Sequence, residues 1–563
     1  MIYHCEDHTC NYWDEGEKLP ERCPQCGRKL LRANEADMTG DDWTALGNTL
    51  WDAEASDKKR MVDCFRKAAY LGSAWGVCNL GICMEQGNGV EADPVQAFWL
   101  YQQAVEMGSL NAVCCLGVCY QYGIGTAPDA KQAAELYCKA AEYGSPRGQM
   151  LLAHAFHDGI GVEADAAEAV HWVRAAAYQR YGEGMHRLGV CYEYGDGVEQ
   201  NWEHAVHWFR EAAESGVSTA MTDLGYCYEK GCGVEQSWEQ AFSWYRRGAE
   251  CGYPVSMSNL GLCYKRGYGV EQNWQEAVKW YEQGAQCGDL QSMHNLACCY
   301  ERGEGVEQNE ERALYWYRRG AEAGSDYCMY CLGWNYSNGE GVEQNMTEAI
   351  RWYTAAAEGG NADAMHNLGW HYDHGEGVEQ DMKKAICWYE RAAEQNHPAA
   401  MNSLGECYAM GRGVPRDLET AMEWYRRAAE LGEAMADYNM GWHLEQAGKL
   451  SEAYAHYRKA ADGNDDSAWW ALGRFYENGV VVAQDGKEAR RCYETGEKLG
   501  SVKCKMRLAR CKLLGIGGRR AKKAGLDLCR QALELAKESS EKEDYGYEAE
   551  MNLLRRTIAE NES

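Results

Sequence analysis

Apolar and small residues recur along most of the chain with a period of 36 residues. Counted from the residue that opens each period, positions 1, 2, 4 and 5 are apolar or small and share one face of a helix, as Leu188 and Cys191 do. Glycines follow at positions 8 and 10, for example Gly195 and Gly197, and glycine ends helices because it adopts a positive φ without steric cost. Each period therefore predicts a helix, helix A, that begins in the preceding period and stops at these glycines.

The second part of each period predicts another helix, helix B. Position 14 carries a side chain that can accept hydrogen bonds from the first N–H groups of a helix, which is worth about 1 kcal/mol. These residues are Asp93, Asp129, Asp165, Asn201, Ser237, Asn273, Asn309, Asn345, Asp381 and Asp417. Position 18 is alanine in these units, and positions 21 and 22 are often an aromatic pair such as Trp208 and Phe209. We therefore expect helix B to be packed on two sides, with the tryptophan column in the core.

Fourteen such units can be traced along the chain. They open at Leu46, Leu80, Leu116, Leu152, Leu188, Leu224, Leu260, Leu296, Leu332, Leu368, Leu404, Met440, Leu472 and Leu508. Units that bury their apolar faces only against their neighbours stack into a solenoid, and its end units are irregular. The sequence thus predicts an all-α fold, an α-solenoid superhelix of about 14 helix-turn-helix repeats.

The string LGxxYxxGxGVxxDxxxAxxWYxxAAxxG, which fits roughly residues 46–507, resembles the Sel1-like repeat family, a relative of the tetratricopeptide repeats. The resemblance implies an α-solenoid that binds other proteins and has no catalytic residues. Some secreted bacterial members bridge paired helices with a disulfide at Cys-x7-Cys spacing, and this chain departs from that spacing. Its cysteines recur at position 4 instead, where we expect small, reduced core side chains.

Four cysteines near the N-terminus have a spacing typical of a metal site: Cys5, Cys10, Cys23 and Cys26. Two pairs of thiolates suit tetrahedral zinc, and so short a segment needs a metal or another staple to fold. The stretch NYWDEGEKLPERCPQCG resembles a rubredoxin-type zinc ribbon. We expect Zn²⁺ at these four ligands. The alternatives are His8 in place of one cysteine, iron (Fe) in place of zinc, and four unrelated thiols.

The pattern divides the chain into four expected parts. They are a zinc ribbon (residues 1–34), a polar linker (35–42), the repeat solenoid (43–507), and a divergent last repeat with capping helices (508–563). The capping helices are expected from about Gly525 to Ser539 and from about Tyr547 onward. They would cover the last apolar face of the solenoid, which otherwise has no neighbour.

The charge balance is acidic, because 57 Lys and Arg residues face 86 Asp and Glu, a formal net charge of −29. Such a surface repels phosphate backbones and anionic lipids over most of its area, so no nucleic-acid or membrane partner is expected. The sequence shows neither a transmembrane helix nor a signal peptide. We therefore expect a cytoplasmic protein whose 27 cysteines are largely reduced.

Helix A is expected to line the inner face of the solenoid, and its position 36 is asparagine in several units, including Asn259 and Asn295. The resemblance to tetratricopeptide repeats implies that this asparagine clamps an extended peptide backbone or a carboxylate. An amide suits that task because it both donates and accepts hydrogen bonds. Alternatively, the asparagine ties neighbouring helices together.

Positions 6 and 7 of three neighbouring units form a basic strip: Lys230, Lys265, Arg266 and Arg302. In an acidic chain this strip could receive an acidic segment of a partner, and the alternative is pairing with nearby glutamates. Further along, aromatic residues take position 3, at Trp334, Trp370 and Trp442. They either anchor a ligand or fill the groove between superhelical turns.

Together these features favour a non-enzymatic scaffold or adaptor that binds a protein or an extended peptide on the concave face of the solenoid. No histidine stands with a nucleophile at the spacing of a catalytic motif. The alternative function is electron transfer by a mononuclear iron at the four N-terminal cysteines.

Overall fold

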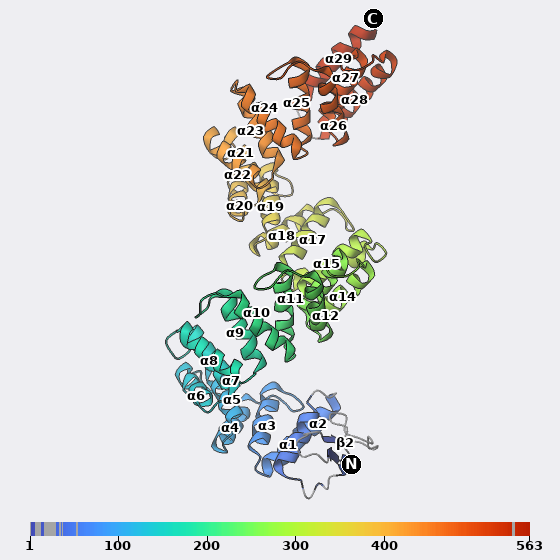
Figure 1. Cartoon of the computed structure of the whole chain (residues 1–563). Coiled ribbons are helices and arrows are strands. Elements are labelled where there is room, and N and C mark those ends of the chain that lie inside the picture. The colour runs from blue at the N-terminus through green and yellow to red at the C-terminus, as the bar shows by residue number, and fades with distance from the viewer. Residues whose placement is uncertain are drawn as a thin grey trace. The chain divides into compact units, whose positions relative to one another are not determined.

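The computed structural model describes residues 2–5, 13–15, 30–32, 35, 38–51, 55–542 and 547–562. The chain forms two compact units, Met1–Ser292 and Met293–Ser563. In each of them the helices follow one another in chain order as stacked pairs (Figure 1). No helix in this described part has both the length and the apolar composition needed to cross a membrane.

Three short strands precede the helices: β1 (Ile2–Cys5), β2 (Trp13–Glu15) and β3 (Leu30–Arg32). They pair antiparallel in the order β2-β1-β3. Of the predicted metal-site residues, Cys5 ends β1, where the backbone alone is described, and the others lie outside the described residues: His8, Cys10, Cys23 and Cys26. Among the side chains that are described, no three His, Cys, Asp or Glu residues form a group that could hold a metal ion. The N-terminal metal site therefore stays a prediction.

The described helices alternate between the two predicted kinds. Helices A are α1 (Gly40–Thr49), α3 (Ala74–Gln86), α5 (Leu110–Tyr122), α7 (Pro146–Asp158), α9 (Gly182–Tyr194), α11 (Ser218–Lys230), α13 (Pro254–Arg266), α15 (Leu290–Arg302), α17 (Asp326–Asn338), α19 (Ala362–His374), α21 (Pro398–Met410), α23 (Ala434–Gln446), α25 (Asp466–Asn478) and α27 (Val502–Leu514). Helices B are α2 (Ala55–Tyr70), α4 (Pro94–Glu106), α6 (Ala130–Glu142), α8 (Ala166–Tyr178), α10 (Trp202–Glu214), α12 (Trp238–Glu250), α14 (Trp274–Gln286), α16 (Glu310–Glu322), α18 (Met346–Glu358), α20 (Met382–Glu394), α22 (Leu418–Glu430), α24 (Leu450–Asp462), α26 (Gly486–Lys498) and α28 (Lys522–Lys542). Each unit of the sequence repeat thus supplies one helix pair.

Neighbouring helices pack on one another throughout each compact unit. In the first unit each successive pair of helices from α1 to α14 is in contact, and helices A of adjacent repeats also touch, as α3 and α5 do. In the second unit the same succession runs from α16 onward. Because each repeat buries its apolar faces mainly against its neighbours, the predicted α-solenoid of helix pairs is confirmed within each unit.

The helix ends follow the signals in the sequence. At position 14, the side chain of Asn201 accepts a hydrogen bond from the backbone N–H of His204 at 3.0 Å and so caps helix B. Helix A of the same repeat ends at Gly195, whose φ of 75° lies in the left-handed region. The glycine at position 10 has a second role, because a Cβ on Gly197 would lie 2.1 Å from the carbonyl oxygen of Ala166 in the preceding repeat. These two glycines allow the tight turn between the helices.

In most repeats the core is built around an aromatic residue at position 22. Tyr245 is 1% exposed, and its ring packs on Gly225, where an added Cβ would lie 2.6 Å from the ring. The same contact with the glycine at position 2 recurs for Tyr101, Tyr137, Tyr281, Tyr353, Tyr389, Tyr425, Tyr457 and Tyr493. That glycine is therefore needed for the close approach of helices A and B.

The tryptophan at position 21 lies at the edge of this core. Trp388 and Trp424 are partly buried and pack against buried residues of helices A and B. Arginines three residues later cover their outer faces, with the Arg391 guanidinium 4.3 Å from the Trp388 ring and that of Arg427 4.5 Å from the Trp424 ring. The predicted tryptophan column thus contributes to the core, but the aromatic residue after it is buried more completely.

Two helices end the second unit at bounds close to those expected from the sequence. They are α28 and α29 (Glu548–Glu562), and both pack on α27. Arg507 of α27 donates to Glu550 of α29 at 2.7 Å and pairs with Glu477 at 3.3 Å. The first of these charge-assisted bonds fastens α29 to α27, and the second joins α27 to α25 of the preceding repeat.

Candidate functional site

The binding residues expected from the sequence lie on helices A of both units. The first unit contains Lys230 on α11 and, on α13, Asn259, Lys265 and Arg266. The second unit contains Trp334 on α17, Trp370 on α19 and, on α15, Asn295 and Arg302. The structure therefore divides the expected residues between its two units.

The basic residues stand at the ends of their helices. Lys230, Arg266 and Arg302 are the last residues of α11, α13 and α15. Positive charge is favourable there because the unpaired carbonyl groups make a helix C-terminus partly negative. Lys230 also pairs with Glu229 at 2.7 Å, as expected if the basic residues pair with nearby glutamates. Local interactions thus explain part of the basic strip without a ligand, and its anion-binding role stays a prediction.

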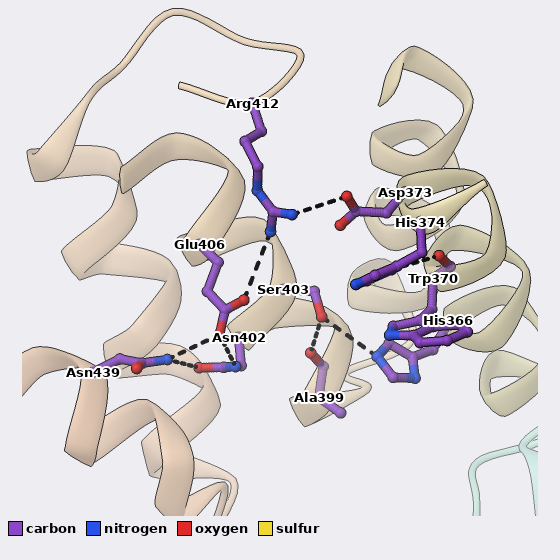
Figure 2. A network of polar contacts seen from close by, with 10 residues as sticks. All are labelled: His366, Trp370, Asp373, His374, Ala399, Asn402, Ser403, Glu406, Arg412 and Asn439. Carbon is purple, nitrogen blue, oxygen red and sulfur yellow. Dashed lines mark hydrogen bonds and ion pairs between the residues drawn. The ribbon is translucent and has the colours of Figure 1, made fainter. Parts of the chain in front are cut away.

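In the second unit, polar and aromatic side chains gather on α19, α21 and α23 (Figure 2). We call this surface the A-helix face and define it by positions 3 and 7 of these helices: Trp370, His374, Glu406, Met410, Trp442 and Gln446. Figure 2 shows Arg412, from the loop after α21, reaching across to α19. Side chains from three successive repeats therefore meet on one surface.

Arg412 joins α21 to α19 by charge. Its guanidinium donates to the carboxylate of Asp373 at 2.9 Å and lies 3.7 Å from that of Glu406. The Asp373 side chain is only 4% exposed, so its charge needs a partner to offset the loss of hydration. Because the Arg412 side chain is 39% exposed, the loop that carries it presents a cation flanked by two carboxylates to the solvent.

Asparagines at position 36 tie helices of adjacent repeats together at two places. Asn439 donates to Asn402 at 3.0 Å and to Glu406 at 3.2 Å, which links α23 to α21 (Figure 2). In the first unit, Asn79 donates to Asn48 of the preceding helix A at 2.8 Å. These two bonds fit the alternative that the asparagine ties neighbouring helices together. A peptide-clamping role for Asn259 and Asn295 stays a prediction.

The position-3 tryptophans present aromatic surface to the solvent. Trp334, Trp370 and Trp442 are 44%, 37% and 37% exposed. Trp370 stacks on His374 with ring centroids 4.3 Å apart, and His374 Nδ1 hydrogen-bonds to the Trp370 carbonyl oxygen at 2.9 Å. The tryptophan ring is thus held in place from one side and open on the other, which suits an apolar anchor.

A cavity of about 360 Å³ lies between α21, α22 and α23. Its lining consists of Glu406, Met410, Arg412, Tyr425, Tyr438, Asn439, Trp442 and His443. Apolar and aromatic walls with a few convergent polar groups are typical of a binding pocket. This cavity can accept a side chain that has an apolar stem and a polar end.

We expect His366, which lies beside Trp370 in Figure 2, to remain neutral at physiological pH. Burial and then the nearby His397, whose ring centroid is 5.1 Å away, lower the pKa of His366 to about 4. Because the pKa in the unfolded chain is near 6.5, the unfolded state binds the proton more tightly, and this histidine should reduce stability as pH falls from about 6.5 to 4. An NMR titration, assigned with His366→Gln, should give a midpoint near 4, and a midpoint near 6.5 would contradict the expectation.

Arg412, Glu406 and Met410 were not among the binding residues expected from the sequence. A signal for the arginine does exist, because position 9 is acidic in the two preceding repeats, at Glu340 and Glu376. Arg412 is therefore a local charge reversal that a comparison of the repeats with one another could find. Nothing comparable marks Met410, which is 58% exposed.

Comparison with known proteins supports the repeat assignment. The family model described as Sel1 repeat matches residues 76–109, 112–145, 146–181, 182–217, 218–253, 254–289, 290–325, 326–361, 362–397, 398–433, 434–465 and 468–501. The chain is similar to the crystal structure of a protective antigen of uropathogenic Escherichia coli strains that displays an SLR fold. That match has 28% identity and a TM-score of 0.53, and it covers 76% of this chain and 94% of the antigen. A Sel1 repeat protein from Oxalobacter formigenes matches with 32% identity and a TM-score of 0.40, over 43% of this chain and 96% of that one. Comparison with curated proteins gave no match.

Proposed function

The chain belongs to the Sel1 repeat family, and from this premise we propose that it is a non-enzymatic scaffold that binds a segment of another protein. Repeat folds of the Sel1 and tetratricopeptide type generally mediate protein–protein interaction. We place the binding surface on the A-helix face of the second unit. The observation that carries this choice is the cavity bordered by the exposed Trp442 and Met410.

The chemistry of this surface favours binding of a polypeptide. Trp370 and Trp442 offer flat apolar surface, and aromatic residues of this kind dominate the energy of many protein interfaces. Arg412, Glu406 and Asn439 provide donors and acceptors beside them, and Glu406 is held by an ion pair with Arg412 and a hydrogen bond from Asn439. A surface that is already ordered loses little conformational entropy when a partner binds.

The contact between Ser403 and His366, beside the A-helix face, does not point to an enzyme. Ser403 Oγ lies 3.4 Å from His366 Nε2, but it also donates to the carbonyl oxygen of Ala399 at 3.0 Å (Figure 2). A general base works best when its pKa is near the operating pH, whereas burial lowers the pKa of His366 to about 4. This pair is therefore a poor device for activating a hydroxyl group.

Site-specific photo-crosslinking in cells tests the placement of the surface. A photoreactive phenylalanine analogue at position 410 should capture a partner protein, because Met410 is 58% exposed at the edge of the cavity. The matched control is position 315 on α16, where Tyr315 is 52% exposed on a helix B. Equal capture at both positions, or capture at 315 alone, would contradict the placement.

We also propose that the N-terminal segment holds a structural zinc ion at Cys5, Cys10, Cys23 and Cys26. The proposal is supported by the spacing of the cysteines and by the shortness of the segment that carries them, since so short a segment rarely folds without a metal or another staple. Metal analysis of the purified full chain should give one zinc per chain, and Cys23→Ser with Cys26→Ser should remove it. Stoichiometric iron and a red colour would instead favour electron transfer.

A further inference from the structure

A second cavity of the second unit, of about 230 Å³, has an acidic lining drawn from α15, α16 and α17. Three glutamates line it: Glu301 near the end of α15, Glu310 at the start of α16 and Glu340 in the loop after α17. Among the described residues that line this cavity none is basic, and none belongs to the A-helix face. Glu310 has a local explanation, because negative charge is favourable at a helix start. Glu301 has no such explanation.

Glu301 stands at position 6 of its repeat and lacks a cation that other repeats supply. Its carboxylate accepts a hydrogen bond from the Tyr317 hydroxyl at 3.3 Å. In three other repeats the position-6 glutamate accepts from a tyrosine and also pairs with a basic side chain. These ion pairs are Glu229 with Lys230 at 2.7 Å, Glu445 with Arg474 at 2.7 Å and Glu477 with Arg507 at 3.3 Å. Within the described part of the chain, no ion pair joins Glu301, Glu310 or Glu340 to a basic side chain, and the adjacent Arg302 is exposed and does not line the cavity.

The charge of Glu301 is therefore poorly compensated. Burial raises the pKa of its carboxyl group, and the charges of Glu340 and Glu310 act in the same direction. The hydrogen bond from Tyr317 and the charge of Arg302 oppose this rise without cancelling it. A cation inside the cavity would stabilise all three carboxylates at once.

A buried amide supplies an independent sign of a ligand. Asn335 of α17 lines the cavity and is only 4% exposed, and its Oδ1 accepts no hydrogen bond from any described residue. It occupies position 4, where other repeats bury a cysteine such as Cys227 or Cys263. Because an unpaired buried oxygen costs stability and the repeat packs well with a thiol there, the amide is explained by a ligand that donates a hydrogen bond.

We propose that this cavity binds an alkylammonium group, supplied by a lysine side chain of a partner protein or by a free polyamine. An ammonium nitrogen carries three N–H donors and no acceptor, which matches the Asn335 oxygen and the carboxylates of Glu301 and Glu340. Since no three of the described side chains form a group that could hold a metal ion, a cation that reaches separate acceptors through hydrogen bonds fits better than a bare metal ion. The volume is several times the roughly 30 Å³ that one water molecule occupies, so the cavity has room for such a group. The proposal does not depend on the function assigned to the A-helix face.

Isothermal titration calorimetry on the full chain, at constant ionic strength, tests the ligand chemistry. n-Butylammonium should bind at one site and about fivefold or more tightly than tetramethylammonium, which has the same charge but no N–H donor. Equal affinity for the two cations would show only general attraction to an acidic protein. That result, or displacement of n-butylammonium by an equal concentration of Mg²⁺ or Ca²⁺, would overturn the proposal.

Three variants test the placement of the site. Glu301→Gln keeps an acceptor for Tyr317 and should weaken n-butylammonium binding by about tenfold or more, because a charge-assisted hydrogen bond is lost. Asn335→Cys installs the residue that other repeats bury, so it should weaken binding without lowering the unfolding temperature of the unliganded chain. The matched control is Glu376→Gln, the same change of charge at position 9 of the next repeat, where the glutamate is exposed and does not line the cavity. Unchanged binding in both site variants, or an equal loss in Glu376→Gln, would contradict the placement.

Two further ligands distinguish the sources of the ammonium group. Nα-acetyl-lysine N-methylamide represents a lysine within a polypeptide, and cadaverine represents a free diamine. Tighter binding of the lysine derivative would identify a partner protein as the source, and tighter binding of cadaverine would identify a polyamine. If neither binds more tightly than tetramethylammonium, the cavity is not an alkylammonium site.

Discussion

Replacing Tyr245 with alanine is expected to lower the free energy of unfolding by about 3–5 kcal/mol. The side chain is 1% exposed and fills the space between helices A and B of its repeat. Gly225 of helix A packs directly on the ring and has no side chain. Nothing on that side can therefore fill the cavity that the substitution leaves. Urea unfolding followed by circular dichroism measures the loss. Hydrogen exchange should locate it in α11 and α12, because a repeat depends mainly on its nearest neighbours.

Two further variants separate the sources of this effect. Tyr122→Ala removes a tyrosine that is 69% exposed and should change stability by no more than about 0.5 kcal/mol. Tyr245→Phe keeps the ring but removes the hydrogen bond to Glu229, which measures 2.8 Å, and should cost about 1 kcal/mol. A loss of similar size for Tyr122→Ala and Tyr245→Ala would show that position 22 is not the centre of the core.

The fold could be predicted in detail because its determinants are local and repeated. An N-cap such as Asn201 and a helix-ending glycine such as Gly195 act within a few residues. Most repeats carry both signals at the same positions. The relative burial of the two aromatic positions was less evident. Both Trp424 and Tyr425 look like core residues in the sequence, and only their packing shows that Arg427 covers the tryptophan while the tyrosine is enclosed.

The candidate site could be predicted only in part. The register of the repeat places Trp334 and Trp370 together on helices A, and the structure exposes both of them. The ion pair of Arg412 with Asp373 joins residues 39 positions apart, in different repeats, and it depends on the direction that a long side chain takes from a loop. The charge reversal at position 9 marks Arg412 in the sequence, but it does not show that the partner is Asp373, because neighbouring repeats carry other residues at both positions.

The basic strip shows how a pattern can be explained by local physics. Lys230 and Arg266 recur at the same place because each ends a helix, where positive charge is favourable whether or not a partner binds. The tryptophans at position 3 have no comparable local reason to be exposed, since burying such a ring would be worth about 2 kcal/mol or more. This contrast is why the aromatic residues, and not the charges, carry our placement of the binding surface.

Replacing Trp370 and Trp442 with alanine is therefore expected to have the largest effect on binding. For the partner captured through position 410, each substitution should weaken binding by about 2 kcal/mol, roughly a 30-fold increase in Kd. Each removes an aromatic ring that is 37% exposed on the A-helix face, and Trp442 also lines the cavity. Isothermal titration calorimetry with the purified partner gives the affinities.

The matched control is Trp99→Ala, which removes an exposed tryptophan from a helix B of the first unit, where 63% of the residue is accessible. It should leave Kd unchanged, and all three variants should keep their helix content because exposed positions contribute little to stability. An equal loss of affinity in Trp99→Ala would point to a nonspecific apolar effect. Unchanged affinity in both Trp370→Ala and Trp442→Ala would show that the partner binds elsewhere, because a partner docked on the A-helix face would contact these two exposed rings.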